Sequence, residues 1–356
     1  MPANHRARSR ARLAMATAVA AVLVFGLTGT VAAKDKRELT VMTRNLYLGA
    51  DIALVLGART PEEFVFLVWR TYGVVQLTDY PTRAVELAAE IDAADVDIVG
   101  LQEVTTWTAS GPGAPPSFDF LAILQQELAD RGLSYSVAAV SNNLNVGPVP
   151  LLCGVPLAPA CQLSYQDRDV ILVNTATPGL RVTGADDGRY VAQQTAGLLG
   201  TPISFDRGWT SIDAELDGKS FTFANTHLEI GAFAAVQEAQ GREFLAGPGR
   251  GGGAVIAVGD FNSAADGSTT STYAELTKSW FADAWDLNPG DPGLTCCQNE
   301  TLSNPTSQLH SRIDLVLTHG AVRAVEAHLV GATPFQNVAP FWASDHAGVV
   351  ATVRLH

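Results

Sequence analysis

One apolar run that ends in polar residues, AVIAVGDFNS at positions 254–263, constrains this chain more than any other segment. Its length and its branched, small residues indicate a buried strand. Asp260 and Asn262 follow at once, so they would lie at the mouth of that strand. Gly-Asp and Asn-Ser are also ordinary turn pairs, and the segment alone predicts a turn as readily as a functional site. Recurrence of the same arrangement elsewhere in the chain favours the site.

Further segments place polar side chains directly before or after an apolar, strand-like run. They contribute Asn45 in VMTRN, Glu103 in DIVGLQE, His227 in FTFANTHLE, Asp314 in SRIDLVL, and Asp345 with His346 in SDHAGVV. A glutamate that follows an apolar run is costly to bury unless it is paired or binds a metal. Carboxylates, amides and imidazoles at several strand ends therefore predict one convergent cluster.

Apolar runs alternate with helical patterns along the chain, which predicts an α/β protein. Helices are expected at 81–94 and at 117–132, the latter with a Ser start and a Gly stop. Asp217-Gly218 fits a type I′ turn within a hairpin at 209–229. Other strands are expected at 38–49, 96–104, 135–140, 169–174, 254–260, 312–320, 322–331 and 346–355.

Three segments are less regular. Residues 50–78 contain helical patches and are expected to form an insertion, and the glycine-rich run 247–253 is expected to be a helix-to-strand loop. Residues 141–164 are apolar but rich in Pro and Gly, which excludes a regular helix. They predict either a surface loop or a lid that faces substrate or membrane. With neither an internal repeat nor a long linker, residues 34–356 are expected to form one domain.

The first 33 residues have the pattern of an export signal. Four arginines precede an uncharged, largely apolar stretch at 13–27, and the small residues that follow predict cleavage near Ala33. A membrane anchor is the alternative, but a span requires roughly 20 apolar residues and this stretch is shorter. We therefore expect a secreted protein.

Cysteine usage agrees with export, because disulfides form in oxidising compartments. Cys153 and Cys161 bracket a short stretch rich in Pro and Gly and are the expected disulfide pair. Cys296 and Cys297 are adjacent in the chain, so their pairing stays open. Zinc is the weaker alternative, because no histidine lies at ligand spacing.

The acidic balance of the chain limits its partners. The formal net charge is −13, and it becomes −17 without residues 1–33, which hold four Arg and no acidic residue. Tight passive binding to nucleic acid requires Lys and Arg at the phosphates, which argues against that class of protein. An enzyme that meets phosphate through a metal ion is still compatible, although electrostatic steering would be poor.

Taken together, the motifs resemble the endonuclease/exonuclease/phosphatase superfamily, the DNase I-like metal-dependent phosphoesterases. Asn, Gln-Glu, Thr-His-Leu, Gly-Asp-Phe-Asn, Arg-Ile-Asp and Ser-Asp-His occur in the family's order across residues 38–356. The resemblance implies a four-layer α/β sandwich, in which two mixed β-sheets pack face to face with helices outside. The site would lie at one edge of this sandwich. The motifs do not specify the substrate, because nucleases, sphingomyelinases and inositide phosphatases share them.

The chemistry that the resemblance implies is divalent-metal-dependent hydrolysis of a phosphodiester by in-line attack of an activated water. Mg²⁺ prefers carboxylate oxygens and water, with Mn²⁺ or Ca²⁺ as alternatives. Glu103 is the expected direct metal ligand, with Asn45 and Asp345 near it. A bound divalent cation would lower the repulsion between the phosphate and its attacker.

The remaining motif residues are expected to handle protons and phosphate. Asp314 would orient His346 as a base. Asp260 and Asn262 would hold the nucleophile or the phosphate, and His227 would donate to a phosphate oxygen. Whether Asp260 or His346 takes the proton stays open.

Arg168, in YQDRDVILV, is a secondary candidate for the site. A guanidinium at the start of a strand could clamp a phosphate oxygen. The alternative is a salt bridge with Asp167 or Asp169, its neighbours in the chain. Residue types alone support the two interpretations equally.

A nuclease-like substrate, DNA or RNA, is the first expectation, and no stable protein partner is implied. The alternatives are a phosphomonoesterase or a sphingomyelinase-type phospholipid phosphodiesterase with transient membrane contact. The apolar segment 141–164 favours lipid, whereas no aromatic, basic membrane-binding segment supports it. A non-catalytic binding protein on the same fold is the alternative from another class. Such a protein would be expected to lack some of Glu103, Asp260, Asn262, Asp314 and His346, and all five are present.

Overall fold

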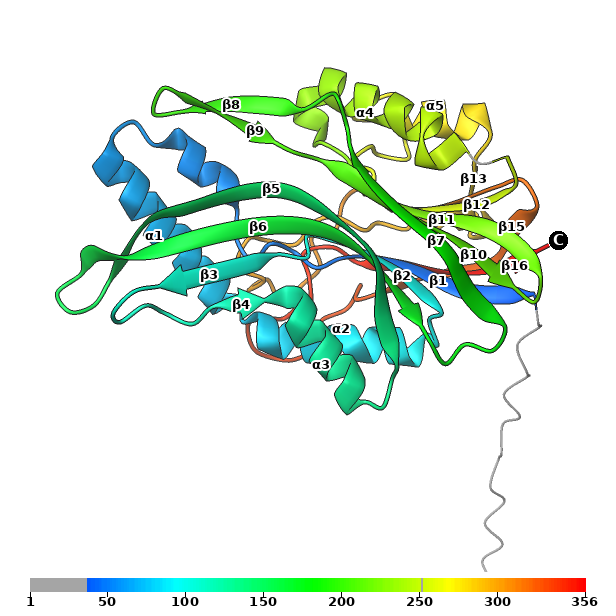
Figure 1. Cartoon of the computed structure of the whole chain (residues 1–356), viewed down its shortest axis with the longest axis horizontal. Coiled ribbons are helices and arrows are strands. Elements are labelled where there is room, and N and C mark those ends of the chain that lie inside the picture. Colours follow the sequence, from blue (N-terminus) through cyan, green and yellow to red (C-terminus); the bar gives the residue numbers. More distant parts are fainter. Residues whose placement is uncertain (1–36, 251) are drawn as a thin grey trace, which may run out of the picture. The chain divides into compact units, whose positions relative to one another are not determined.

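The computed structural model describes residues 37–250 and 252–356. In this part of the chain, two large β-sheets pack face to face, and helices cover the outer face of each sheet (Figure 1). The four-layer α/β sandwich predicted from the sequence is therefore confirmed. The expected export segment, residues 1–33, lies outside the described residues. No helix among the described residues has the length and apolar character needed to cross a bilayer.

The first sheet has eight strands in the order β15-β16-β1-β2-β6-β3-β4, and β5 pairs with β6. Because β1 and β2 run parallel, with Asn45 beside Gln102, both strands end at the same edge. The start of β16 lies at that edge too, since β16 runs antiparallel to β1. The bounds are β1 (Glu38–Asn45), β2 (Ile98–Gln102), β3 (Thr106–Ser110), β4 (Phe118–Asp119), β5 (Tyr135–Cys153), β6 (Ala158–Asn174), β15 (Val322–Val330) and β16 (Gly348–Leu355).

The second sheet has six strands in the order β13-β14-β12-β11-β10-β7, with β11 and β12 parallel. Its strands are β7 (Leu180–Arg189), β10 (Gly208–Leu216), β11 (Lys219–His227), β12 (Ala254–Asp260), β13 (Ala282–Asp283) and β14 (Asp314–His319). A separate two-stranded sheet consists of β8 (Gln194–Leu198) and β9 (Thr201–Phe205).

Helices of the outer layers pack against the sheets, and the buried face of α4 includes Gln237 and Gln240 as well as Phe244. On the first sheet lie the 3₁₀ helix η1 (Ile52–Gly57) and the α-helices α1 (Pro61–Leu77), α2 (Tyr80–Ala93) and α3 (Phe120–Asp130). On the second lie α4 (Ala234–Ala246) and α5 (Thr272–Ser279). Short 3₁₀ turns complete the set: η2 (Gly231–Phe233), η3 (Pro248–Arg250) and η4 (Ala284–Leu287).

Local sequence explains where these helices begin and end. Thr60 caps α1, where its hydroxyl accepts from the Glu63 amide at 3.1 Å. Asp119 caps α3 in the same way, so this helix begins at Phe120, three residues after the predicted Ser117 start. Gly132 has a φ of 78° beyond the end of α3, as the predicted glycine stop requires.

Alternation of side chains along the strands divides the interior into layers. Val41 and Ile98 face the second sheet, whereas Met42 and Val99 face the helices. The two sheets approach closely at Gly100, where an added Cβ would lie 2.8 Å from Oδ1 of Asn225 and closer still to Val258. Glycine is therefore required here because a larger residue would overlap the opposite sheet.

Most of the predicted elements are present. The hairpin of β10 and β11 turns at Asp217 and Gly218, whose φ angles of 47° and 80° are both positive, as a type I′ turn requires. The expected insertion at 50–78 consists of η1 and α1. Residues 247–250 contain η3 and lead towards β12, as expected for a helix-to-strand loop.

The irregular loop or lid expected at 141–164 is wrong, because β5 and β6 form a long hairpin through this segment. The ladder is interrupted at several register shifts, and one of them, between Val146 and Val149, spans Gly147-Pro148. A strand tolerates Pro and Gly at such irregular positions. The expected disulfide is present between Cys153 and Cys161, whose Cα atoms lie 5.9 Å apart near the tip of the hairpin.

We expect Gly100→Ala to lower the free energy of unfolding by about 1–3 kcal/mol, because the methyl group would overpack the space between the sheets. Gly73→Ala is the matched control: Gly73 lies in α1, and nothing is within 4 Å of an added Cβ there. This control should stabilise the protein by about 0.4–1 kcal/mol. Urea unfolding of both variants measures the difference, and equal stability of Gly100→Ala and wild type would contradict the packing described above.

Candidate active site

The layer between the two sheets changes from apolar to polar at one end. Each of β1, β11, β12 and β14 continues its inward face with one polar residue at that end: Asn45, His227, Asp260 and Asp314. Strand register places His227 beside Asp260, and Asp260 opposite Asp314. The strand pleat and the register together therefore bring four separate motifs to one place.

His346 is held by Asp314. Its Nδ1 lies 2.8 Å from Oδ2 of Asp314, while Nε2 lies 3.8 Å from Oδ2 of Asp260. Burial alone would lower the pKa of His346, but the carboxylates of Asp314, Asp345 and Asp260 raise it well above its ordinary value. Asp314 therefore fixes one ring nitrogen and leaves the other beside Asp260.

Asp260 is the centre of the polar cluster. Its Oδ2 accepts from the Asn45 side chain at 3.2 Å and lies 3.6 Å from Nε2 of His227. Its Oδ1 accepts from the backbone of Asn262 at 2.9 Å. Burial, with the charge of Asp314, raises the pKa of Asp260 to about 7. This carboxyl group therefore holds its proton far more readily than an exposed aspartate.

Glu103 enters the same space from the end of β2. Its Oε2 accepts from the Leu48 amide at 2.6 Å. Burial, with the charge of Asp345, raises the pKa of Glu103 to about 8. Glu103, Tyr47 and Asn262 all have positive φ angles, of 57°, 62° and 50°, which are uncommon for residues other than glycine. Such backbone strain concentrates at functional sites.

These side chains border one pocket of about 500 Å³. Its walls include Glu103, His227, Asp260, Asn262, Asp345 and His346, while Asn45 and Asp314 support it through the hydrogen bonds described above. The structure thus brings together all the sequence-predicted site residues except Arg168, and their individual roles stay predictions.

The donor set suits a hard divalent cation. Glu103 and Asp345 both line the pocket and repel each other, and the fully buried Asn45 adds an amide at the end of β1. Burial and mutual repulsion raise the pKa of the Glu103 carboxyl, and a bound cation would relieve that repulsion. Oxygen ligands of this kind are those that Mg²⁺ prefers. The residues therefore fit the metal that the sequence predicts.

The phosphate-binding role considered for Arg168 is wrong. Val170 and Leu172, which share its face of β6, pack against the helices, so Arg168 projects away from the space between the sheets. Its guanidinium donates to Asp119 at 2.7 Å and to Thr106 at 2.9 Å. The alternative, a salt bridge with Asp167 or Asp169, is also wrong, because strand alternation sends those side chains to the opposite face.

Arg207 is the basic residue of the pocket, and the sequence analysis missed it. Its Nη1 lies 2.9 Å from Nδ1 of His227, and its Nη2 lies 3.9 Å from Oε1 of Glu229. Burial and the charge of Arg207 lower the pKa of His227 well below its ordinary value. A signal existed: Arg207 directly precedes β10, which begins where the antiparallel β11 ends.

Two buried arginines, Arg44 and Arg83, support the site from the helix side of the first sheet, and the sequence analysis assigned a role to neither. Arg44 of β1 contacts Glu90 of α2 at 2.8 Å and donates to the backbone carbonyl of His346. Arg83 of α2 donates to carbonyls on both loops of the site, Leu46 at 2.7 Å and Ala343 at 2.8 Å. Helix α2 thereby ties the loop after β1 to the segment that carries Asp345 and His346.

Cys296 and Cys297, whose pairing the sequence left open, are joined to each other in the structure. Both line the pocket, and Sγ of Cys297 lies 3.8 Å from Nε2 of His346. The adjacent cysteines therefore form part of the wall beside the imidazole.

A second polar cluster lies deeper between the sheets. Asn143 donates from its amide to Asp169 at 3.0 Å and to Asp167 at 3.4 Å. Four buried oxygens of the cluster have no hydrogen-bond partner among the described residues: Ser141 Oγ, Asn143 Oδ1, Asp167 Oδ1 and Asp169 Oδ1. Burial raises the pKa of both carboxyl groups, and for Asp169 the charge of Asp167 adds to the rise. The cluster is thus rich in acceptors and poor in donors.

Comparisons with known proteins agree with this geometry. A model of the Endonuclease/Exonuclease/phosphatase family matches residues 75–346. A search of curated proteins gives no match.

Several solved structures share the fold at low sequence identity. A protein of this family from Bacteroides thetaiotaomicron is 16% identical, with a TM-score of 0.56 over 90% of this chain and 98% of that one. A mannosyl-6-phosphatase from the same organism is 17% identical, with a TM-score of 0.53 over 88% and 99%. TDP2 from D. rerio, complexed with a single-strand DNA product, is 14% identical, with a TM-score of 0.52 over 89% and 99%.

The acceptor-rich cluster leads to a pH-dependent prediction for Asp169→Asn. Folding raises the pKa of Asp169. Above the ordinary pKa of an aspartate, the unfolded chain has released the proton that the folded protein still holds. Wild-type stability should therefore fall as the pH rises. The variant keeps a neutral amide, which also supplies a donor, and should exceed wild-type stability by about 1–3 kcal/mol at pH 8.

The advantage of Asp169→Asn should shrink towards pH 4.5, where the wild-type carboxyl is itself protonated. Urea unfolding at both pH values provides the measurement, and Asp187→Asn, at an exposed position on β7, is the control. A variant that is less stable than wild type by the same amount at both pH values would show that the carboxylate is favourably bound.

Proposed function

Because the chain belongs to the Endonuclease/Exonuclease/phosphatase family, whose members hydrolyse phosphoester bonds, we propose that it is a divalent-metal-dependent phosphodiesterase. The observation that carries the proposal is the Asp314–His346 pair, with Nε2 of His346 beside Asp260, in the same pocket as Glu103. An imidazole oriented by a buried carboxylate next to a second acid is an arrangement suited to activating water.

Asn45, Glu103 and Asp345 would hold the metal. When bound, Mg²⁺ would neutralise charge on the phosphate and stabilise the leaving oxygen. The amide of Asn45 also donates to Asp260 at 3.2 Å, so it lies between the proposed ligands and the proposed proton-transfer groups.

Proton transfer is assigned to Asp260 and His346. Oδ2 of Asp260 and Nε2 of His346 are 3.8 Å apart, a distance at which one water molecule can contact both. Asp314 holds the imidazole through Nδ1, so Nε2 is the ring nitrogen available for exchange. Attack of that water opposite the leaving oxygen would break the ester bond without a covalent intermediate.

Arg207 and His227 would bind the phosphate. Arg207 lies 2.9 Å from the imidazole of His227, and both line the pocket on the side of the second sheet. A guanidinium suits phosphate because its planar donors match two oxygens. We assign to Arg207 the phosphate contact that the sequence analysis considered for Arg168.

The sequence predicts a nucleic acid as the first substrate to test. The similar solved structures differ in the substrates that their names imply. One is described with a DNA product and another is named a mannosyl-6-phosphatase. A panel of plasmid DNA, RNA, sphingomyelin and inositol phosphates, each with and without Mg²⁺, separates the classes. Failure on every phosphoester would favour the non-catalytic alternative.

We also propose that the protein is exported and that residues 1–33 are removed. The proposal rests on the four arginines and the apolar stretch of the leader. N-terminal sequencing of protein collected from the culture medium tests it. Protein retained in the cell with residue 1 intact would contradict it.

Metal dependence is the first prediction from this function. Hydrolysis of bis(p-nitrophenyl) phosphate should stop in EDTA and return when Mg²⁺ or Mn²⁺ is added in excess. Release of p-nitrophenol measures the rate directly. Full activity in the chelator would remove the metal from the mechanism.

Substitutions in the proton-transfer pair are the second prediction. His346→Ala and Asp260→Asn should each reduce kcat at least about a hundredfold, the usual scale for a positioned acid or base. His328→Ala, on the exposed side of β15, is the matched control and should keep wild-type activity. Circular dichroism verifies folding, and near-normal rates in either folded variant would contradict the assigned role.

A further inference from the structure

A second cavity adjoins the catalytic pocket, and its lining is apolar. We propose that this cavity, which we call the apolar chamber, binds the alkyl or acyl chain of an amphiphilic phosphodiester whose phosphate lies in the catalytic pocket. The inference rests on the proposed phosphodiesterase function and specifies its substrate class. It favours a phospholipid-like molecule over a nucleic acid.

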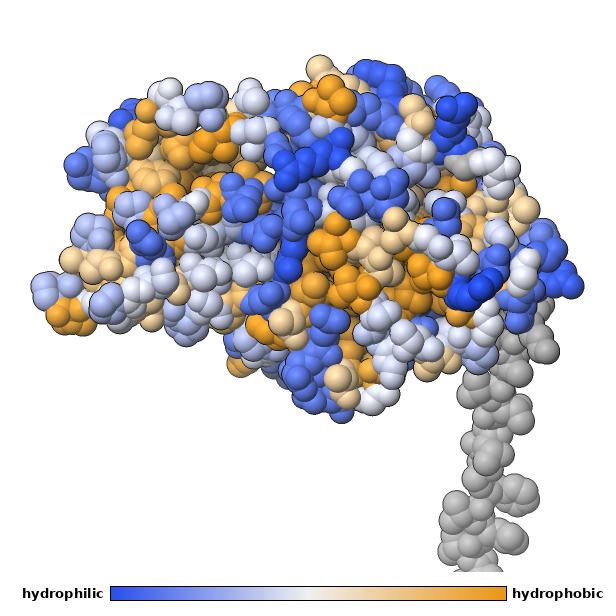
Figure 2. All heavy atoms as spheres, viewed as in Figure 1, coloured by the Kyte–Doolittle hydropathy of each residue, from blue (hydrophilic) through white to orange (hydrophobic). Residues whose placement is uncertain are grey.

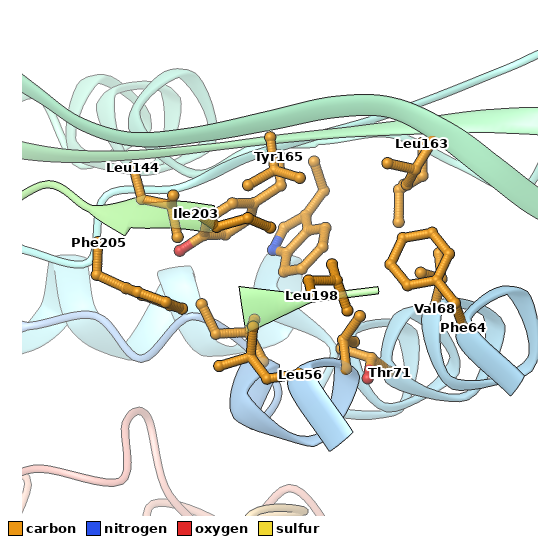
Figure 3. Close-up of a pocket in the computed structure, with 15 residues that line it drawn as sticks. Leu56, Phe64, Val68, Thr71, Leu144, Leu163, Tyr165, Leu198, Ile203 and Phe205 are labelled. Atoms are coloured by element: carbon orange, nitrogen blue, oxygen red, sulfur yellow. The ribbon is translucent and has the colours of Figure 1, made fainter. Parts of the chain in front are cut away.

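The apolar chamber has a volume of about 90 Å³ (Figure 3), and its lining comes from seven elements: η1, α1, β3, β5, β6, β8 and β9. None of the described residues that line it is charged. Each element supplies side chains to its wall, for example Leu56 of η1, Val68 of α1, Leu144 of β5, Leu163 of β6 and Ile203 of β9. These side chains point towards one another across the space in Figure 3.

Three residues connect the apolar chamber to the catalytic pocket. Ile52, Leu56 and Phe205 line both cavities, so the two share a wall. A ligand with its polar group beside Glu103 and His346 can therefore extend an apolar tail past these side chains. The space-filling view shows apolar atoms in a hollow of the surface near α1 and the β8–β9 hairpin (Figure 2).

The β8–β9 hairpin has a structural reason to cover the apolar chamber. It pairs with neither large sheet in the described part of the chain, and an isolated two-stranded hairpin is marginally stable in water. Its apolar residues Leu198, Ile203 and Phe205 turn towards the chamber and supply the contacts that hold it. The hairpin therefore forms one wall of an apolar space rather than a polar rim.

Charge in the catalytic pocket also argues against a polyanionic strand. Arg207 is the one Lys or Arg among the described residues that line it. Six lining residues are acidic: Asp51, Glu103, Glu229, Asp260, Glu300 and Asp345. A nucleic acid would bring several phosphates to this surface and needs a cation for each. A diester with one phosphate and an uncharged tail carries a single negative charge, which the metal and Arg207 can neutralise.

The volume sets the expected chain length. A water-sized group needs about 10–15 Å³ by this measure, so the apolar chamber accommodates roughly six to nine such groups. Each buried methylene should raise kcat/KM about fourfold until the chamber is filled. The gain should then level off.

A homologous series of alkyl p-nitrophenyl phosphodiesters tests the inference, from the methyl to the dodecyl ester, with Mg²⁺ and below the micellar concentration. For the full chain, kcat/KM should rise by about three to five orders of magnitude over the series and level off at roughly six to nine carbons. Hydrolysis of the methyl ester by itself reports on the proposed function, independently of the tail.

Two variants connect the chain-length effect to the apolar chamber. Val68→Trp should fill it from α1, and Ile203→Asp should place a charge in its wall from the half-exposed hairpin, where misfolding is less of a concern. Both should lose most of the gain for octyl over methyl while hydrolysing the methyl ester at the wild-type rate. Val191→Trp, at a position that is 91% exposed, is the matched control and should keep the gain.

Other outcomes would overturn the inference. If the wild type hydrolyses methyl and octyl esters equally well, the tail site is refuted while the phosphodiesterase function stands. A gain that persists in both variants would place the tail elsewhere. A higher kcat/KM on DNA or RNA than on the octyl ester would refute the substrate class. If the wild type hydrolyses no ester at all, the proposed function fails, and the inference fails with it.

Discussion

Crowding of buried carboxyl groups at one end of the interlayer space is the constraint on which the site depends. Asp260 and Asp314 face each other across neighbouring strands of the second sheet, and Glu103 enters from the first. Unpaired buried charge is costly, so each acid requires a hydrogen-bond donor, an imidazole or a cation. Burial, together with this crowding, raises the pKa values of Glu103 and Asp260, and the crowding favours a divalent metal.

Two buried arginines hold the loops of the site in place despite the repulsion between these acids. Arg44 and Arg83 are fully buried on the helix side of the first sheet and donate to backbone carbonyls of the loops that carry the site. The loop after β1 and the segment before β16 are thus held by Arg83 of α2, in addition to the bond that Glu103 accepts from the Leu48 amide. The site residues can therefore repel one another without the loops separating.

Much of the site could be predicted because strand ends and pleat are local properties. Asn45, His227, Asp260 and Asp314 each end or begin an apolar run, and two-residue alternation sends all four inwards. The site role considered for Arg168 was wrong for a related reason, because the alternation of β6 directs its side chain outwards. The apolar chamber depends on which distant segments become neighbours, and that is a property of the tertiary fold. Arg207 was missed although it directly precedes a predicted hairpin. Segment 141–164 was misjudged because bulges accommodate its Pro and Gly within a hairpin.

Manganese offers the most direct measurement of the central claim, that separated acids and amides meet to hold a cation beside a base. A crystal soaked in Mn²⁺ should give one strong anomalous peak in the pocket, in contact with side-chain oxygens of Glu103 and Asp345 and close to Asn45. In Glu103→Gln the peak should weaken or disappear. A peak elsewhere on the molecule, with this pocket empty at saturating Mn²⁺, would contradict the account.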